Sequence, residues 1–277
     1  MPHPPRLASP LATIVLAGSL LAAATATAAA AAPPAALAWT PQVTDTWQWQ
    51  LTGKLDTRYD VDVYDIDLFD TPEATIADLH AQGRHVVCYF SAGSGEKWRA
   101  DYDRFLPSDL GKPLDGWKGE RWLDTRSANV RAIMAARMDL AVDKRCDGLE
   151  PDNVDAYTAK TGFPLTKATQ IDYDTWLAAQ AHARGLAVAL KNDVGQLATL
   201  EPHFDFAVNE QCHQYRECGG YDRFTGHGKP VFNAEYQRKY VDDPAERAAL
   251  CAQAQSENLR TLVLPVQLDD RFRYTCD

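Results

Sequence analysis

Short apolar segments recur along the chain and alternate with segments of helical periodicity. Eight of them have the length and the β-branched and aromatic content of strands: residues 47–51, 63–69, 85–91, 146–152, 186–192, 204–210, 230–235 and 261–267. Some are apolar at nearly every position, as in residues 86–90, which is typical of parallel strands covered on both faces. The pattern therefore predicts a largely parallel sheet.

Helical patterns fill four of the intervals between these segments. Three begin near residues with N-cap side chains, namely Thr71, Ser127 and Asp243. A fourth spans residues 174–184 and ends before Gly185. The helices lie between strands, as parallel connections require.

Eight strands alternating with helices predict a (β/α)8 TIM barrel, a single domain of class α/β, since such barrels take about 250 residues. A doubly wound sheet is the alternative fold. It is disfavoured because no strand is followed by a G-x-G-x-x-G or phosphate-binding loop.

The first 32 residues have the layout of a secretory signal peptide. Arg6 precedes an apolar run at 11–24, and small residues with several A-x-A sites follow at 22–32. The apolar run is too short to span a membrane, although a loosely anchored N-terminus is the alternative because one positive charge is few. We expect a leader at 1–32, a Pro/Ala linker at 33–38 and the barrel domain at 39–277, secreted to the periplasm or the exterior.

The charge of the chain limits the kinds of ligand that we expect it to bind. Without the leader, the chain keeps 245 residues, 27 of them basic and 38 acidic, for a formal charge of −11. Acidity disfavours a nucleic-acid backbone and favours a neutral or cationic ligand. No later apolar run approaches the roughly 20 residues of a membrane span. We expect a monomer with no nucleic-acid partner, and no membrane association in the mature form.

The cysteines predict disulfides rather than a metal site. Six cysteines follow a leader, an even number in an oxidising compartment. Neither C-x-x-C nor H-x-x-x-H spacing occurs, so we expect no metal and no cofactor. Sequence alone leaves 15 connectivities open. One of them pairs Cys212 with Cys218 in a small loop and Cys251 with Cys276 near the C-terminus, which leaves Cys88 to pair with Cys146.

Carboxylates and amides follow almost every predicted strand, where a TIM barrel carries its chemistry. A single acidic residue after a strand is commonly a helix N-cap, but glutamates within apolar runs are poor caps. Convergent carboxylates with aromatic side chains suggest hydrolysis of glycosidic bonds by a carboxyl pair. The candidate site residues, in strand order, are Trp49, Asp65, Asp67, Tyr89, Ser91, Glu150, Asp152, Asn153, Lys191, Asn192, Glu210 and Glu235.

The order and spacing of these motifs resemble glycoside hydrolase family 114. The motifs are W-Q-W-Q at 47–50, Y-D-I-D at 64–67, C-Y-F-S-A-G at 88–93, C-D-G-L-E-P-D-N-V-D at 146–155, K-N at 191–192 and N-E-Q-C at 209–212. The resemblance runs from about Trp39 to the C-terminus. It implies a TIM-barrel endo-α-1,4-polygalactosaminidase that cuts polymers such as partly deacetylated galactosaminogalactan, a cationic polysaccharide.

The resemblance implies Asp152 as nucleophile or base and Glu210 as general acid/base. Lys191, Asn192 and Tyr89 would orient the sugar, and the other candidates would bind it. Glu150 and Asp152 share strand parity, so which of them is nearer the sugar stays open, as does retention against inversion. A non-catalytic polysaccharide-binding barrel and an α-glycanase of another polymer are the alternative functions.

Overall fold

A sheet of nine strands forms the centre of the fold. Eight of the strands correspond to the predicted segments, while the ninth is the short C-terminal β12. The computed structural model describes residues 36–277, so the predicted leader and the first residues of the linker lie outside the described part. The order in the sheet is β1-β2-β3-β7-β8-β9-β10-β11-β12, and only the last pair is antiparallel. The strands are β1 (Trp47–Gln50), β2 (Val63–Asp67), β3 (His85–Ser91), β7 (Gly148–Asp152), β8 (Ala187–Lys191), β9 (Phe206–Glu210), β10 (Val231–Glu235), β11 (Arg260–Val263) and β12 (Tyr274–Thr275).

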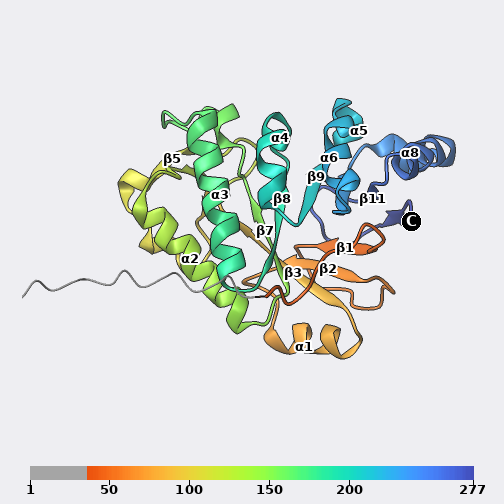
Figure 1. The fold of residues 1–277 in the computed structure, drawn as a ribbon, viewed down its shortest axis with the longest axis horizontal. Coiled ribbons are helices and arrows are strands. Elements are labelled where there is room, and N and C mark those ends of the chain that lie inside the picture. The colour runs from red at the N-terminus through yellow and green to blue at the C-terminus, as the bar shows by residue number, and fades with distance from the viewer. Residues whose placement is uncertain (1–35) are drawn as a thin grey trace, which may run out of the picture. The chain divides into compact units, whose positions relative to one another are not determined.

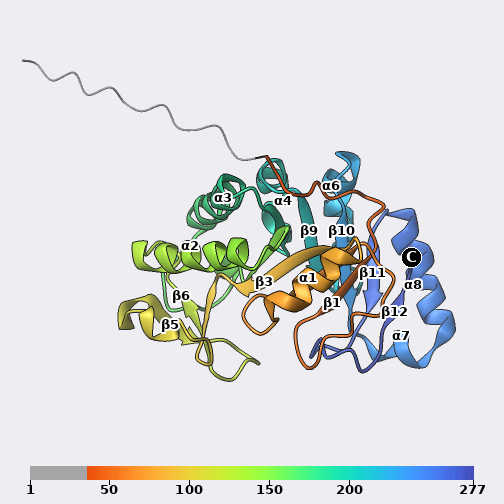
Figure 2. The ribbon, with the colours of Figure 1, turned by 90° about the horizontal axis from the view of Figure 1, so that it is seen from below.

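Helices lie around the outside of these strands (Figures 1 and 2). They are α1 (Glu73–Ala81), α2 (Ala128–Asp143), α3 (Lys167–Ala183), α4 (Leu197–Leu200), α5 (Cys212–Tyr215), α6 (Asp222–Gly226), α7 (Arg238–Asp242) and α8 (Pro244–Ser256). Residues 51–62, between β1 and β2, contain no helix. Of the helices among residues 36–277, none has the length and apolarity needed to cross a membrane.

Side-chain caps explain where most of the predicted helices begin. The Ser127 and Asp243 side chains accept hydrogen bonds from backbone N–H groups in the first turns of α2 and α8, as predicted. Helix α3 begins seven residues earlier than its apolar pattern indicates, because Thr166 caps it and its first buried residue is the polar Gln170. Helix α1 starts after Pro72 without a side-chain cap, since Thr71 belongs to the turn that follows β2.

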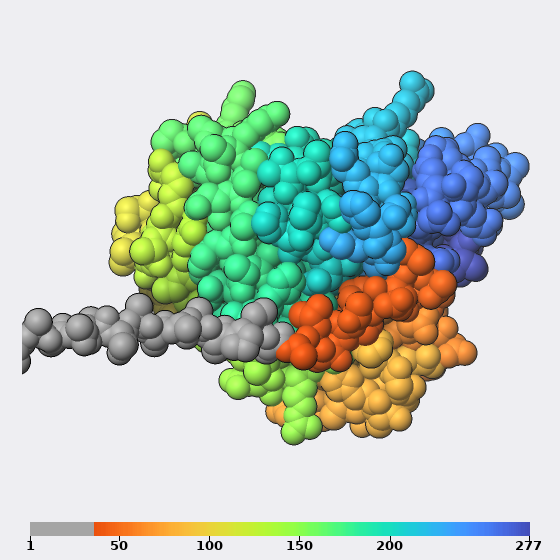
Figure 3. Space-filling model, in the orientation of Figure 1, coloured from red at the N-terminus to blue at the C-terminus, as the bar shows by residue number. Residues whose placement is uncertain are grey.

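The two ends of the parallel sheet meet and close the barrel. Trp47 Nε1 on β1 donates to the Arg260 carbonyl of β11 at 2.8 Å, and Leu51 N donates to the Leu268 carbonyl at 3.1 Å. The Trp47 ring also stacks on Phe232 of β10, with centroids 5.0 Å apart. Figure 3 shows the orange segment that carries β1 beside the blue C-terminal third of the chain. These contacts give the predicted TIM barrel.

Alternate strand residues face two separate cores. One parity fills the barrel interior, with Trp47, Trp49, Val63, Val87, Ala189, Phe206, Val208 and Phe232 among its members. The other parity packs against the surrounding helices, with Tyr64, Ile66, Val86, Leu149, Val188 and Leu190 among its members. A residue's place in this alternation therefore decides whether its side chain can reach the mouth of the barrel.

A second, antiparallel sheet is inserted between β3 and α2. Its strands are β4 (Ser94–Glu96), β5 (Leu110–Pro113) and β6 (Glu120–Leu123), in the order β4-β6-β5. The pattern of apolar residues does not predict this sheet, because its strands are short and mix glycine, proline and charged residues.

Three disulfides confirm the expected pairing. They join Cys88 to Cys146, Cys212 to Cys218 and Cys251 to Cys276, with sequence separations of 58, 6 and 25 residues. The first links β3 to the start of β7, within the sheet. The second links α5 to the turn before α6, beside the end of β9, and the third ties the C-terminus to α8.

Replacing both Cys88 and Cys146 with alanine should lower the free energy of unfolding by about 2–4 kcal/mol, because the disulfide closes the longest of the three loops. Urea unfolding measures the change. The matched control is the Cys251→Ala/Cys276→Ala protein, which opens a loop of 25 residues. A larger loss in the control than in the first variant would contradict this ranking.

Candidate active site

The strand-end residues that point into the barrel mouth share the interior parity. Trp49, Lys191 and Glu210 alternate in phase with the interior core residues of their strands, and Glu150 and Asp152 do so with Gly148, which pairs with the interior Val87 of β3. Directly after three of them the backbone enters the left-handed region: φ is 61° at Asn153, 47° at Asn192 and 66° at Gln211. Each of these residues follows the last residue of its strand, so Asp152, Lys191 and Glu210 are the strand-end residues at the mouth.

The Lys191 ammonium lies at the centre of the site. Its Nζ is 2.8 Å from Glu150 Oε1, 3.2 Å from Asp152 Oδ1 and 3.4 Å from Glu210 Oε2. The Trp49 ring covers it, with the centroid 4.7 Å away. Burial alone would lower the pKa of Lys191, but the three carboxylates raise it well above its usual value. Lys191 is therefore a permanent cation that three carboxyl groups share.

Glu150 and Asp65 lie beneath this ammonium and are closed off from solvent. Burial raises the pKa of Glu150 to about 7, although Lys191 opposes the shift. Burial also raises the pKa of Asp65 well above its usual value, and the neighbouring Glu150 carboxylate adds to the shift. Neither Asp65 oxygen nor Glu150 Oε2 has a hydrogen-bond partner among the described residues, so the Glu150 carboxylate is held by Lys191 through Oε1 alone. The pair is the floor of the site.

Asp152 is held at the cavity wall by donors on both of its oxygens. Besides Lys191 at Oδ1, Tyr89 OH donates to Oδ2 at 2.9 Å and Asn153 Nδ2 donates to it at 3.3 Å. Gly93 permits this arrangement, because a Cβ there would lie 1.7 Å from the Asn153 carbonyl oxygen. Asp152 lines the cavity whereas Glu150 is fully buried, so of these two carboxyl groups Asp152 is the one that reaches the cavity.

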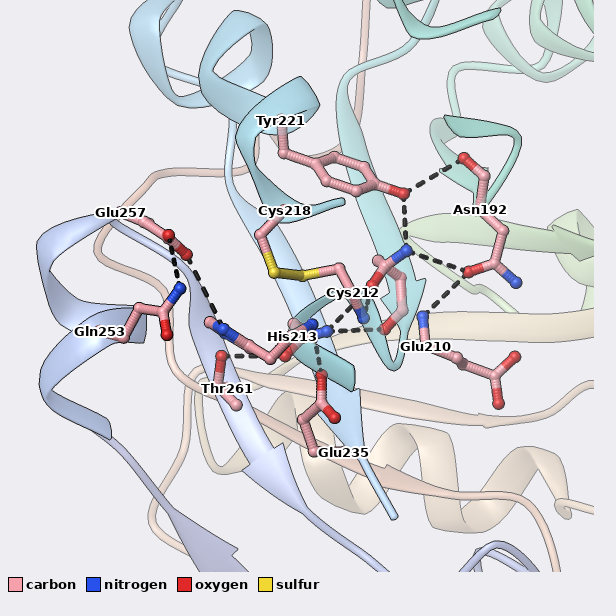
Figure 4. The surroundings of a disulfide bond; sticks show 12 residues. Asn192, Glu210, Cys212, His213, Cys218, Tyr221, Glu235, Gln253, Glu257 and Thr261 are labelled. Atoms are coloured by element: carbon pink, nitrogen blue, oxygen red, sulfur yellow. Dashed lines mark hydrogen bonds and ion pairs between the residues drawn. A yellow bond between two sulfur atoms is a disulfide. The ribbon is translucent and has the colours of Figure 1, made fainter. Parts of the chain in front are cut away.

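Glu210 lies across the mouth from Asp152. Tyr236 OH donates to its Oε1 at 2.5 Å, and its backbone N–H donates to Asn192 Oδ1 at 2.9 Å. Figure 4 shows Asn192, Glu210 and Tyr221 on one side of the Cys212–Cys218 disulfide, with the Tyr221 hydroxyl donating to the Asn192 carbonyl. Disulfide and hydrogen bonds together hold the turn after β9 that presents Glu210.

A cavity of about 620 Å³ opens over these groups. Among residues 36–277, the cavity wall carries a single cation, the already paired Lys191, and six acidic residues: Glu120, Asp152, Asp155, Asp193, Glu210 and Glu217. Burial raises the pKa of Asp193 to about 7. Aromatic side chains complete the wall, including the exposed rings of Trp117 and Tyr215. Such a cavity favours cationic ligands that also have apolar faces.

The structure brings most candidate residues to this cavity, but not all of them. Trp49, Tyr89, Asp152, Asn153, Lys191, Asn192 and Glu210 line it. Asp65, Ser91 and Glu150 are buried beneath or beside them. Asp67 instead pairs with Arg99 at 2.5 Å, and Glu235, which has the outer parity, accepts the His213 backbone N–H at 2.9 Å, as Figure 4 shows.

Several cavity residues are absent from the sequence-based candidates. Tyr236 follows β10 with interior parity, so strand alternation was a signal for it. Asp155, Tyr157 and Asp193 lie in turns after β7 and β8. Glu120 comes from the inserted sheet, whose strands carry no strand signal in the sequence.

Among residues 36–277, one group of three metal-ligand residue types brings its ligand atoms within 4.8 Å of one another: Cys212, His213 and Cys218. Two of its members are joined in a disulfide, so they offer no thiolate to a metal. Of the cavity carboxylates, Asp152 and Glu210 are engaged by the Lys191 ammonium and by the Tyr89 and Tyr236 hydroxyls.

Comparison with known proteins identifies the family to which the chain belongs. The Ega3 protein of Aspergillus fumigatus, solved as a complex with galactosamine, is 42% identical and superimposes with a TM-score of 0.82 over 88% of this chain and 100% of that one. The glycoside hydrolase domain of PelA from Pseudomonas aeruginosa is 16% identical, with a TM-score of 0.64 over 82% of this chain and 96% of that one, and thus shares the fold.

A protein of Deinococcus radiodurans is 28% identical over 235 residues, which are 73% of this chain and 76% of that protein. The sequence profile of glycoside-hydrolase family GH114 matches residues 26–277. The barrel, the carboxyl-lined mouth and this match over nearly the whole chain lead to one conclusion: the protein belongs to glycoside-hydrolase family GH114 and is a glycoside hydrolase.

Proposed function

We propose that this glycoside hydrolase is an endo-acting enzyme that cuts α-1,4-linked galactosamine polymers, including partly deacetylated galactosaminogalactan. The observation that carries the proposal is the cavity wall, on which six carboxyl groups accompany one cation that is already paired. Unacetylated galactosamine units are cationic, and a focused negative field attracts them. The galactosamine bound to Ega3, at 42% identity, supports the same substrate class.

Asp152 is the nucleophile in this proposal and Glu210 the general acid/base. Glu210 protonates the glycosidic oxygen while an Asp152 oxygen attacks the anomeric carbon, so the bond to the leaving sugar breaks and a glycosyl ester forms. Glu210 then takes a proton from water, whose oxygen displaces Asp152. Three donors face Asp152 and stabilise its negative charge, whereas Glu210 is more exposed, with 29% of its side chain accessible against 18%.

The Lys191 ammonium sets an upper limit on the distance between the Asp152 and Glu210 carboxyl groups. The facing oxygens of Asp152 and Glu210 lie 3.2 and 3.4 Å from one nitrogen, so their separation is at most the two distances combined. Retaining glycosidases place their carboxyl groups about 5–5.5 Å apart, and inverting ones about 6.5–9.5 Å apart. Only a linear arrangement through Lys191 would reach the inverting range, and we therefore propose retention.

The remaining cavity residues bind the polymer. We assign sugar contacts to Trp49, Tyr89, Asn153 and Asn192, and ammonium contacts to the acidic side chains Asp155, Asp193 and Glu217. The buried Asp65, Ser91 and Glu150 support these residues from behind. Since the site is built from one chain, the enzyme acts as a monomer in this proposal, and its three disulfides support secretion into an oxidising compartment.

A substrate panel tests the assignment. Purified protein is incubated with α-1,4-galactosamine polymers of graded acetylation and with a neutral α-glucan, and new reducing ends are counted. We expect cleavage of the deacetylated polymer, no cleavage of the glucan, and a rate that falls with added salt because salt screens the attraction. Faster cleavage of the glucan would support an α-glycanase of another polymer, and binding without cleavage would support a polysaccharide-binding protein.

A further inference from the structure

A continuous chain of hydrogen bonds connects the inserted sheet to Asp152. Ser94 Oγ donates to Glu120 Oε2 at 2.5 Å, and Ser91 Oγ and Ser94 Oγ are 2.7 Å apart. Asn153 Nδ2 donates to Ser91 Oγ at 2.9 Å and to Asp152 Oδ2 at 3.3 Å. Ser91 and Ser94 are fully buried, so water does not interrupt the chain.

The donors in this chain all point the same way. The Ser94 hydroxyl donates a hydrogen bond to Glu120. The Ser94 oxygen therefore accepts the hydrogen bond from the Ser91 hydroxyl. Ser91 Oγ then accepts from the Ser94 backbone N–H at 3.1 Å and from Asn153 Nδ2. The Asn153 amide must therefore present its NH2 group, not its oxygen, to Ser91 and Asp152.

Glu120 is the acceptor at the end of the chain. It lines the cavity but is only 7% exposed, and burial raises its pKa to about 7. The Ser94 hydrogen bond opposes that shift, the nearby Glu96 and Asp152 carboxylates add to it, and Arg99 weakens it. Arg99 is itself bound by Asp67 and Glu96, so Glu120 has no cation of its own.

We propose that Glu120 is a positioning residue for Asp152, acting through Ser94, Ser91 and Asn153. The inference rests on the nucleophilic role proposed above for Asp152. Ionised Glu120 accepts from Ser94 and sets the direction of every donor up to the Asn153 amide. That direction supplies Asp152 Oδ2 with a donor beside the Tyr89 hydroxyl.

Protonation of Glu120 reverses this order. A neutral Glu120 donates to Ser94, Ser94 then donates to Ser91, and the Ser91 hydroxyl seeks an acceptor on Asn153. The amide that satisfies it turns its oxygen toward the Asp152 carboxylate, which repels it. Activity therefore rises with pH as Glu120 loses its proton, and the change lies in kcat because the chain orients a reacting group.

Two variants interrupt the chain at different points. Glu120→Leu removes the acceptor, and Ser94→Ala removes the next link without changing a residue that lines the cavity. We expect each to lower kcat about tenfold with KM nearly unchanged, and the double variant to fall no further, since both break one chain. Glu120→Gln keeps an acceptor that does not titrate, so it should retain more activity than Glu120→Leu and lose part of the rise in kcat from about pH 6 to about pH 8.

The exposed Glu73→Gln and Ser256→Ala are the matched controls, and melting temperatures confirm folding. A Ser94→Ala protein with wild-type kcat beside an impaired Glu120→Leu protein would overturn the proposal in favour of direct substrate contact. Additive losses in the double variant, or an unchanged pH profile in Glu120→Gln, would also overturn it. If the wild type itself leaves the galactosamine polymer uncut, the proposed function fails instead.

Discussion

The Asp152→Asn and Glu210→Gln proteins should each hydrolyse the galactosamine polymer about 100- to 10,000-fold more slowly than the wild type. Each replacement keeps the size of the side chain but removes a charge or a proton that the reaction needs. Reducing-end formation at saturating substrate measures the loss. The exposed Asp78→Asn and Glu73→Gln on α1 are the matched controls and should leave the rate unchanged.

The two roles separate when the leaving group is changed. In an aryl galactosaminide with an activated phenol, the phenolate leaves without being protonated. Glu210→Gln should therefore recover much of the rate of the first step on that substrate. Asp152→Asn should not recover it, because attack on the anomeric carbon still requires the carboxylate. Recovery by Asp152→Asn, or full activity of either variant on the polymer, would contradict the assignment of roles.

The Lys191→Met protein should lose at least about a hundredfold in activity and about 3–5 kcal/mol in the free energy of unfolding. Lys191 is the partner of the fully buried Glu150 and faces both proposed catalytic carboxylates. Its removal leaves Glu150 with no counter-charge in a site closed to solvent. Hydrolysis assays and urea unfolding measure the two losses.

The stability loss in Lys191→Met should depend on pH with a defined sign. Burial raises the pKa of Glu150 to about 7 in the wild type although Lys191 opposes the rise, so the pKa of Glu150 is higher still in the folded variant. Below about pH 7 Glu150 is protonated in both folded proteins and adds nothing to the difference between them, and the loss therefore grows as pH rises above about 7. A Lys191→Met/Glu150→Gln protein should regain stability but not activity; regained activity would contradict a catalytic need for the ammonium.

The barrel could be predicted because its strands carry a strong local signal. Segments such as 86–90 and 187–190 are apolar throughout, since both of their faces are covered. The cysteine pairs could only be suggested, since sequence alone leaves 15 connectivities open, and the structure shows the suggested three. The inserted sheet could not, because its strands are three or four residues long, and their stability comes from packing on the barrel rather than from local pattern.

The site residues also divide into those that the sequence pattern predicts and those that it does not. Strand parity separates Glu210, which faces the mouth, from Glu235, which faces α5, and this could be inferred from the sequence. Parity does not explain Asp67, which has interior parity but is bound by Arg99 from the turn after β4. Glu120 likewise depends on the inserted sheet. Residues held by long-range partners from an insertion leave no periodic signal in the sequence.

Chemical trapping tests the central claim most directly. A fluorinated α-galactosaminyl fluoride combines a good leaving group with a ring fluorine that slows hydrolysis of the glycosyl-enzyme. Incubation with the wild type, followed by peptide mass spectrometry, should find the sugar esterified to Asp152 and absent from the Asp152→Asn protein. A label on Glu150 or Glu210, or no label in an enzyme that still cuts the polymer, would contradict the account.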